Sequence, residues 1–543
     1  MKLSGLDFYR MTLSAAAALD NNKTAVNNMN VFPVPDGDTG INMTLTLASV
    51  HTLSDEGLIL GEIAKKIGDT VLRSARGNSG AILSLFFRGM AKAFAGKESA
   101  DAREVAEAFA MGTKEAYKAV ANPTEGTILT VMRRTAEAAD TLSGEYCSKV
   151  EGLLSHLVTV ASNELSHTPD LLPVLRQAHV VDAGGYGFVI MLEGMLAYLQ
   201  GNPIVVEAPT VAPAAADFSQ FETEDVTFAY CTECLVDKYP EYCGEGMVAD
   251  LYRYLSDKGD SLVFVDDESL VKIHIHTNHP GKVLEKALVY GALSTVKIEN
   301  MRLQHSTKVV EEEAASASFK IAVPVKTYGF VAVCMGEGIV STYRELGVDR
   351  VIFGGQTMNP STQDILDAIY QTPSEIVFVF PNNKNILLVA REAAALCQEK
   401  QVVVVPTRNI AQGITALLAF DEAEGCDENL KTMEDAASGV TCISTTHAVR
   451  DCEIDGLSIQ SGQAMGLVNE KIKCVAKTRE ECIAQLTDHL EGISYVTVFY
   501  GCDVKKEDAE VVYRLLNGHL DDDTEIVLVD GGQSVYDYII SLE

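Results

Sequence analysis

Apolar residues recur every three to four positions through the first 200 residues of the chain. Alanine-rich segments with this spacing occupy residues 8–18, 59–72, 102–120 and 128–139, and Gly, Asn, Pro and Thr collect in the breaks between them. Such spacing places the apolar residues on one face of a helix, and the breaks are typical of turns. The pattern predicts an all-helical domain over residues 1–200.

The periodicity changes after residue 225, where short apolar runs predict strands. The first runs lie at 226–230 and 262–265, with a helix expected at 247–256. Later runs lie at 321–325, 331–335, 351–353, 376–380, 402–405, 496–500 and 526–529, with helices between them such as 507–516. Alternation of strands with helices favours an α/β region with largely parallel strands.

These changes divide the chain into parts. Residues 201–224 contain three prolines and a run of alanines, which is typical of a linker, and residues 311–318 form a weaker one. We therefore expect a helical domain over 1–200, an α+β middle domain over 225–310 and an α/β C-terminal region over 318–543. A chain of 543 residues is too long for one core, which agrees with this multidomain interpretation.

Composition narrows the class of protein. The apolar fraction of 47% and charged fraction of 22% are ordinary for a soluble globular protein. The net charge of −33 argues against binding nucleic acid or anionic lipid through phosphates. No apolar run has membrane-spanning length, and the N-terminus does not have the pattern of a signal peptide. Twelve scattered cysteines favour a reducing compartment, so we expect a cytoplasmic protein.

The first candidate chemistry lies in residues 30–43. Asp36 and Asp38 flank a glycine, and Pro33 and Pro35 stiffen the chain just before them. Mg²⁺ favours one or two protein carboxylates and leaves its other positions to water and substrate phosphates. An isolated Asp-Gly-Asp is more often a surface turn, but the apolar residues that precede this one favour the metal site.

Three later segments have the residue types of phosphate-binding loops. They are residues 76–80, 125–129 and 181–187, each rich in glycine or small polar residues and each followed by an apolar helical pattern. Backbone N–H groups at a helix N-terminus and a serine hydroxyl can hold a phosphate. The alternative for Ser79, and in the same way for Thr127, is a simple helix cap, which the residue alone favours. No P-loop sequence occurs.

In this order, the segments 30–43, 76–80, 125–129 and 181–187 resemble the ADP-binding subunit superfamily of dihydroxyacetone (glycerone) kinases, called DhaL. In detail they are similar to the branch that includes the fatty acid kinase component FakA and the YloV-like proteins. The similarity continues through 230–233 and 354–362 and so covers nearly the whole chain. It implies an N-terminal DhaL-like helical barrel that binds ATP and a DegV-like C-terminal region.

The resemblance also implies roles for individual residues. Asp36 and Asp38 would be catalytic residues and ligands of two Mg²⁺ ions, with Asn30 as a further ligand at a spacing that departs from the family pattern. The ATP contacts would be Thr39, Asn42, Asn78, Ser79, Gly80, Thr127, Asp182 and Gly184.

A second metal site is expected in the middle domain. His274 and His276 alternate with isoleucines, so on a strand they face one side, about 7 Å apart. Cys231 and Cys234 offer thiolates nearby, and a Cys/His set favours Zn²⁺. The resemblance implies that Cys231, His274 and His276 bind zinc, with Cys234, His279 or water as the fourth ligand. The alternative is a pair of partly exposed histidines.

The resemblance implies the ATP-binding catalytic subunit of a fatty acid kinase. It would transfer the γ-phosphoryl group to a fatty acid presented by a DegV-like carrier, which would dock on the C-terminal region. Two alternatives stay open: a dihydroxyacetone-type kinase acting on a hydroxyl, and a noncatalytic regulator that binds nucleotide and zinc. Residues 355–362 precede a helix and suit either an N-cap or a carboxylate or phosphate site. The oligomeric state is open, with a homodimer among the options.

Overall fold

The computed structural model describes residues 2–30, 37–54, 57–120, 123–141, 149–206, 230–239, 242, 248–256, 258–266, 270–300, 321–355, 359–454, 456–487, 492–521 and 523–543. The chain forms two compact units, one made of Met1–Thr210 with Ala322–Glu543 and the other of Val211–Ile321. Among the described residues no helix has both the length and the apolar character needed to cross a membrane. The expected fold class is confirmed, with a helical N-terminal domain, a mixed middle domain and an α/β C-terminal region.

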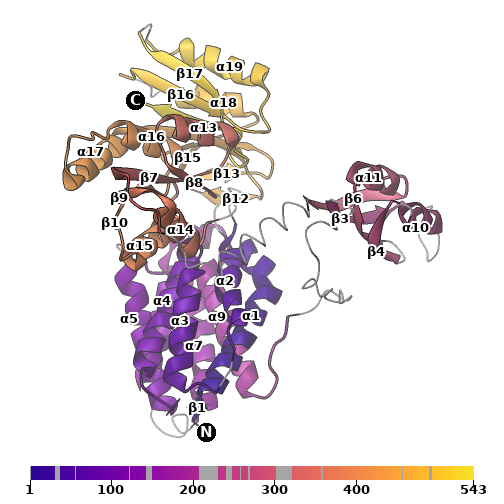
Figure 1. Ribbon diagram of the computed structural model, residues 1–543, viewed down its shortest axis with the longest axis vertical. Coiled ribbons are helices and arrows are strands. Elements are labelled where there is room, and N and C mark those ends of the chain that lie inside the picture. Colours follow the sequence, from indigo (N-terminus) through magenta and orange to yellow (C-terminus); the bar gives the residue numbers. More distant parts are fainter. Residues whose placement is uncertain are drawn as a thin grey trace. The chain divides into compact units, whose positions relative to one another are not determined.

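The N-terminal domain is a helical barrel (Figure 1). Phe86 is buried in its core and makes edge-to-face contacts with Phe109 and Phe188 at centroid distances of 5.4 and 5.3 Å. These three aromatic side chains join two consecutive helices to a third that lies far away in sequence. The helices are α1 (Gly5–Asn28), α2 (Thr39–Ala48), α3 (Leu60–Arg73), α4 (Gly77–Phe94), α5 (Ala102–Ala119), α6 (Ile128–Thr141), α7 (Val150–Leu171), α8 (Pro173–Gln177) and α9 (Ala183–Leu199).

Short elements complete the ends of these helices. Strands β1 (Leu3–Ser4) and β2 (Ser99–Ala100) pair antiparallel, and a 3-10 turn, η1 (Ser49–Thr52), follows α2. Ser4 and Asp101 are the N-caps of α1 and α5, and each forms a capping box with the acidic residue three positions later. Such reciprocal bonds satisfy N–H groups that a helix start leaves without partners.

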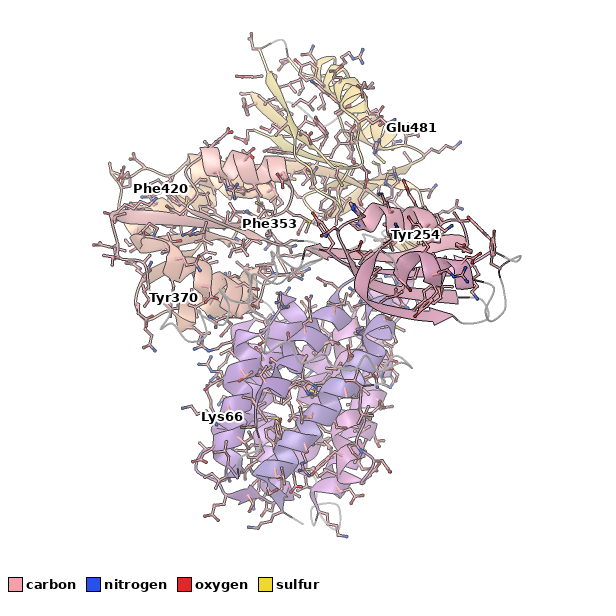
Figure 2. All side chains as sticks on the ribbon, turned by 45° about the vertical axis from the view of Figure 1, so that its right-hand side comes forward. Lys66, Tyr254, Phe353, Tyr370, Phe420 and Glu481 are labelled. Atoms are coloured by element: carbon pink, nitrogen blue, oxygen red, sulfur yellow. The ribbon has the colours of Figure 1, made fainter. Side chains whose placement is uncertain are left out.

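The first half of the C-terminal region is a parallel sheet in the order β10-β9-β7-β8. Its strands are β7 (Lys326–Cys334), β8 (Arg350–Phe353), β9 (Ser374–Phe380) and β10 (Gln401–Val404), and its helices are α13 (Glu337–Glu345), α14 (Thr362–Gln371), α15 (Leu387–Leu396), α16 (Ile410–Leu418) and α17 (Cys426–Gly439). Phe420, labelled in Figure 2, packs edge-to-face against Phe330 at 4.9 Å beside this sheet. The expected strand at 321–325 is wrong, because β7 begins at Lys326.

The second half holds a six-stranded sheet in the order β15-β14-β11-β18-β16-β17. Only β16 and β17 are parallel, and the other described pairs are antiparallel. The expectation of largely parallel pairing is therefore wrong for this half. The strands are β11 (Thr441–His447), β14 (Ala464–Val468), β15 (Lys471–Ala476), β16 (Tyr495–Tyr500), β17 (Glu525–Asp530) and β18 (Tyr538–Leu542). A hairpin of β12 (Cys452–Ile454) and β13 (Leu457–Ile459) and helices α18 (Arg479–Leu486) and α19 (Lys506–Asn517) complete it.

The α/β region packs on the helical domain through α14 and α15, which lie against α3 and α4 (Figure 1). Ile365 and Ile369 of α14 and Val389 of α15 belong to the same buried apolar cluster as Leu83 and Phe87 of α4. This shared core joins two parts of the chain that residues 211–321 separate in sequence.

Residues 211–321 form the second unit, whose described part is an antiparallel sheet in the order β4-β5-β3-β6. The strands are β3 (Tyr230–Lys238), β4 (Gly259–Asp266), β5 (Leu270–Thr277) and β6 (Gly291–Asn300), with helices α10 (Ala249–Ser256) and α11 (Pro280–Ala287). Leu251 and Leu255 of α10 and Val283 of α11 pack on Ile273 and Ile275 of β5, so both helices cover one face of the sheet. Residues 311–318 and most of 201–224, expected as linkers, lie outside the described residues.

The close approach of α4 and α5 generates a prediction about stability. A Cβ atom on Gly89 would lie 2.5 Å from Gly112 Cα and 2.6 Å from Met111 O. Gly89→Ala should therefore lower the free energy of unfolding by about 1–3 kcal/mol, because the two helices must separate. Gly439→Ala is the control, because no atom lies within 4 Å of its added Cβ. Urea unfolding followed by circular dichroism measures both, and equal midpoints for the two variants would contradict this packing.

Candidate functional site

A cavity of about 240 Å³ opens where helices α2, α4, α6 and α9 begin. Its lining includes eight residues expected from the sequence, namely Asn30, Asp38, Thr39, Asn42, Asn78, Ser79, Asp182 and Gly184. The first turn of a helix has N–H groups without intrahelical partners and carries a partial positive charge. Several helix starts at one cavity make it suited to a phosphate-bearing ligand.

Asp38 lies directly before α2 and is buried, with 7% of its surface exposed. Its Oδ2 atom accepts a hydrogen bond of 2.6 Å from Nδ2 of Asn359, a residue of the α/β region. Beside it, the Thr39 hydroxyl donates to Asn30 Oδ1 at 3.0 Å. Asp36, the other expected catalytic carboxylate, lies outside the described residues.

The 76–80 segment owes its shape to Gly77. Its φ of 58° lies in the left-handed region, and a Cβ atom there would be 2.7 Å from Asn42 Nδ2 and 3.2 Å from Asn359 Nδ2. A larger residue would therefore be strained and would also displace two side chains of the site. The glycine allows α4 to begin beside the cavity.

The structure corrects the interpretation of Ser79 as a helix cap. Arg76 is the N-cap of α4, so Ser79 is the third residue of the helix and lines the cavity. Two other residues expected to contact ATP, Thr127 and Gly80, are not among the residues that line the cavity. The Thr127 hydroxyl donates to Thr124 O at 2.7 Å, and Gly80 packs against the Thr46 side chain.

Asp182 links two of the helix starts. As the N-cap of α9, it accepts a hydrogen bond of 2.7 Å from Gly185 N. Burial raises the pKa of Asp182 to about 6, although backbone donors from Gly185, Ile128 and Gly184 act in the opposite direction. A carboxyl group with a raised pKa inside a cavity is a common mark of a functional site.

Sequence reasoning missed the residues that the α/β region contributes. Lys384 and Asn385, from the loop after β9, line the cavity, and Asn78 Nδ2 donates to Asn385 Oδ1 at 3.2 Å. Asn359 comes from the loop after β8, within the polar segment whose sequence suits a helix cap or an anion site. The N-cap is confirmed, because Ser361 and Asp364 form the capping box of α14. The polar residues that follow β8 and β9 in the sequence were the signal that could have indicated this contribution.

The chemistry of the cavity suits a hard cation. Carboxylate, amide and hydroxyl oxygens surround it, and these are the ligands that Mg²⁺ prefers. No group of three or more His, Cys, Asp and Glu side chains within the described part is arranged to hold a metal ion. The two carboxylates that line the cavity, Asp38 and Asp182, fit the small number of protein carboxylates that Mg²⁺ takes.

The middle unit brings the expected soft ligands together by strand register. Cys231 of β3 pairs with His276 of β5, and Glu233 pairs with His274. On the other side of β3, Glu299 of β6 pairs with Cys231, which adds a carboxylate position that the sequence alone does not indicate. The side chains of these residues lie outside the described set.

Cys234, one option for the fourth zinc ligand, belongs to the other face. It is buried in the apolar cluster with Ile273, its register partner, beneath helices α10 and α11. Burial raises the pKa of the Cys234 thiol to about 11, which opposes the thiolate that a metal requires. Because successive residues of a strand alternate between faces, Cys234 and Cys231 occupy positions on opposite faces of β3.

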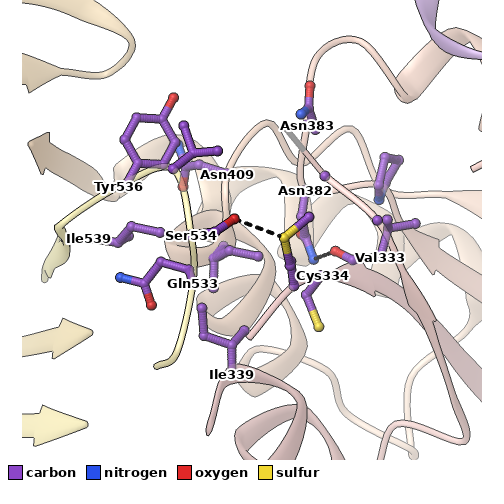
Figure 3. Close-up of a pocket in the computed structure, with 16 residues that line it drawn as sticks. Val333, Cys334, Ile339, Asn382, Asn383, Asn409, Gln533, Ser534, Tyr536 and Ile539 are labelled. Carbon is purple, nitrogen blue, oxygen red and sulfur yellow. Dashed lines mark hydrogen bonds between the residues drawn. The ribbon is translucent and has the colours of Figure 1, made fainter. Parts of the chain in front are cut away.

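A second cavity, of about 70 Å³, lies between the two sheets of the α/β region (Figure 3). Cys334, Ile339 and Ile539 form apolar walls, and Asn382 and Gln533 face them. The Asn382 amide donates to Val333 O at 3.0 Å. The loop after β9 separates the two cavities, since residues 381–383 line this one and residues 384–385 line the first.

Comparison with known families gives the class of protein. Residues 33–197 match the DAK2 domain, residues 227–308 match the middle domain of FakA-like (fatty acid kinase) proteins, and residues 329–543 match the C-terminal domain of the same proteins. These matches follow the helical, mixed and α/β parts of the structure. They define a multidomain protein of a kinase family.

Relatives over the full length give the particular family. The chain is 39% identical over 559 residues to protein YloV of Bacillus subtilis, covering 100% of this chain and 99% of that protein. It is 37% identical over 557 residues to an uncharacterized protein of Staphylococcus epidermidis, with 100% of both covered. The chain belongs to the YloV-like family.

Solved structures that align with this chain belong to the DegV family. One from Corynebacterium glutamicum covers 41% of this chain and 98% of its own, with 14% identity and a TM-score of 0.32. A second, described as fatty acid binding of a DegV family protein from Thermus thermophilus, covers 40% of this chain and 99% of its own, with 12% identity and a TM-score of 0.30. The family assignment rests on the full-length relatives.

The raised pKa of Asp182 predicts a pH effect. A folded-state pKa of about 6 exceeds the ordinary value, so the folded protein binds this proton more tightly than the unfolded chain does. The stability that protonation adds is present at lower pH and is lost as pH rises toward 6 and above. Asp182→Asn keeps an oxygen for Gly185 N and removes the charge. Its melting temperature relative to wild type should be higher at pH ~7.5 than at pH ~5, and an equal difference at both would contradict this assignment.

Proposed function

We propose that this chain is the ATP-binding catalytic subunit of a fatty acid kinase. The observation that carries the proposal is the polar cavity, where four helix starts surround the buried Asp38 carboxylate. In this proposal Asp36 and Asp38 hold Mg²⁺, while backbone N–H groups and the Ser79 hydroxyl hold phosphate oxygens. Family membership supports the reaction class, and the donor atoms of the cavity support the cation.

The chemistry needs no general base. A fatty-acid carboxylate is already ionised at neutral pH, so one of its oxygens attacks the γ-phosphorus directly. A new O–P bond forms as the bond between the γ-phosphorus and the bridging oxygen breaks, and ADP leaves with that electron pair. Bound Mg²⁺ supplies neutralisation of the phosphate charge. The residues of the cavity orient the phosphates and hold the cation.

A separate carrier presents the fatty acid in this proposal. Eight of the thirteen residues that line the cavity have amide, carboxylate or hydroxyl side chains, which suit phosphates and a cation better than an acyl chain. Each CH₂ group left in water costs about 0.8 kcal/mol, so the acyl chain of the fatty acid needs an apolar binding site. A DegV-like protein that docks on the α/β region can shield the tail and expose the carboxylate.

Loss of a proposed Mg²⁺ ligand tests the catalytic proposal. Asp38→Ala, and likewise Asp36→Ala, should lower acyl-phosphate formation by about 10²-fold or more, because one preorganised electrostatic group is removed. The assay traps acyl phosphate with hydroxylamine, with and without a DegV-like carrier, and includes dihydroxyacetone as a second acceptor. Asp20→Ala, an acidic control on α1 outside the cavity, should keep full activity. Wild-type turnover in the Asp38 variant, or transfer to dihydroxyacetone alone, would refute the proposal.

We also propose one zinc ion in the middle unit, held by Cys231, His274 and His276. The register of β3 and β5 supports this set, and Glu299 is the fourth ligand that the register favours. Zinc commonly takes such Cys and His ligands in tetrahedral sites. The neighbouring strands can hold them in place without a long loop.

Metal analysis tests the zinc proposal. Freshly purified protein should contain about one zinc per chain, and the double variant His274→Ala, His276→Ala should contain none, since structural zinc needs all of its protein ligands. Cys234→Ala should retain the metal because that thiol lies in the apolar core. Wild-type protein that contains no zinc when prepared without chelator would contradict the zinc site and favour two histidines that bind no metal.

A further inference from the structure

We propose that the α/β region completes the phosphoryl-transfer site, with Asn359 positioning the Asp38 carboxylate and Lys384 contacting the nucleotide phosphates. This inference rests on the proposed function and extends it from the helical domain to a site built by both halves of the first unit. The two side chains come from the loops after β8 and β9, at the carboxyl ends of parallel strands.

Asn359 has the contacts expected of a positioning residue. It is buried, with 1% of its surface exposed, and its amide donates to Asp38 Oδ2 at 2.6 Å. This bond orients the carboxylate. The Oδ1 atom of Asn359 is buried and has no hydrogen-bond partner among the described residues. A buried acceptor without a partner is costly, and water on a cation held by Asp38 would satisfy it.

The helical domain holds the Asn359 loop in place through Arg76. The Arg76 guanidinium donates to Asn359 O at 2.8 Å and lies 3.6 Å from the Asp364 carboxylate. The backbone adds a bridge between Arg76 and Ser361 and a bond from Thr362 N to Ala75 O at 3.1 Å. Arg76 thus holds the loop that carries Asn359 in place beside the cavity. Such supporting residues are often nearly as important as the metal ligands themselves.

Lys384 brings a positive charge to the cavity. It is the one cationic side chain among the described residues that line the cavity, where Asp38 and Asp182 are the carboxylates. Its ammonium group lies 3.8 Å from Glu470 Oε2, a long contact on a side chain that is 42% exposed. The adjacent Asn385 accepts from Asn78, so the loop is fixed against α4. A lysine so placed suits a phosphate as a point charge.

The Asn359 test separates positioning from simple contact between the domains. Asn359→Ala should lower kcat by about 10- to 100-fold and raise the Mg²⁺ concentration needed for half-maximal activity by a similar factor, the usual range for a supporting partner of a metal ligand. Gln363→Ala is the matched control, because it removes a 2.8 Å bond to Arg73 in the same interface without touching the cavity. The control should keep the wild-type Mg²⁺ requirement.

The Lys384 test measures nucleotide binding. Lys384→Gln should raise the KM for ATP by about 10-fold or more, while Lys384→Arg keeps the charge and most of the affinity. Glu470→Gln removes the ion-pair partner and should leave KM for ATP unchanged. Lys384 is partly exposed, so its substitution tests the proposal even where Asn359→Ala fails to fold.

The outcomes distinguish this inference from the proposed function. If wild-type protein forms acyl phosphate and Asp38→Ala does not, but Lys384→Gln matches wild type in KM for ATP and Asn359→Ala matches it in Mg²⁺ requirement, the inference is overturned and the function stands. If calorimetry shows no MgATP binding to wild-type protein, both are overturned. Changed constants in these two variants, with wild-type values in both controls, support a site shared by the two halves.

Discussion

The hydrogen bond from Asn359 to the buried Asp38 carboxylate depends on the contacts between the two halves of the first unit. It forms only where α14 and α15 pack on α3 and α4, because that packing brings residues 321 positions apart in sequence to one cavity. Arg76 links the packing of the two halves to the cavity, because its side chain and its backbone both hold the loop that carries Asn359. The 76–80 segment therefore serves the interface as well as the cavity.

Two kinds of donor atoms are kept in separate parts of the chain. Hard oxygen donors surround the cavity of the first unit, whereas the cysteine and histidine positions meet by register on the sheet of the second. This division follows ligand preference, because Mg²⁺ favours carboxylate and water while zinc favours sulfur and imidazole. Under the proposed function, the two sites would therefore bind different cations.

Much of the fold was predictable, and the reasons differ by region. The amphipathic period of residues 59–72 closely anticipates α3 (Leu60–Arg73) because one face of that helix meets the core. In the second sheet β16 and β17 were anticipated, but β11 and β14 were missed, because β11 has the sequence Thr-Cys-Ile-Ser-Thr-Thr-His and β14 contains a glycine, so neither shows clear strand periodicity. Motif resemblance grouped Asp38, Asn78 and Asp182. It could not reveal Lys384, whose loop reaches the cavity only through packing of the two halves.

The shared core of α4 and α15 has a consequence for biosynthesis. The helical domain is complete when α9 ends at Leu199, and α15 ends at Leu396, so about 200 residues are synthesised between them. At roughly 5–20 residues per second, the apolar surface that α15 later covers stays exposed for about 10–40 s. The nascent chain thus passes through a stage in which a nearly finished domain exposes a hydrophobic face, and chaperones that bind such faces have their longest opportunity there.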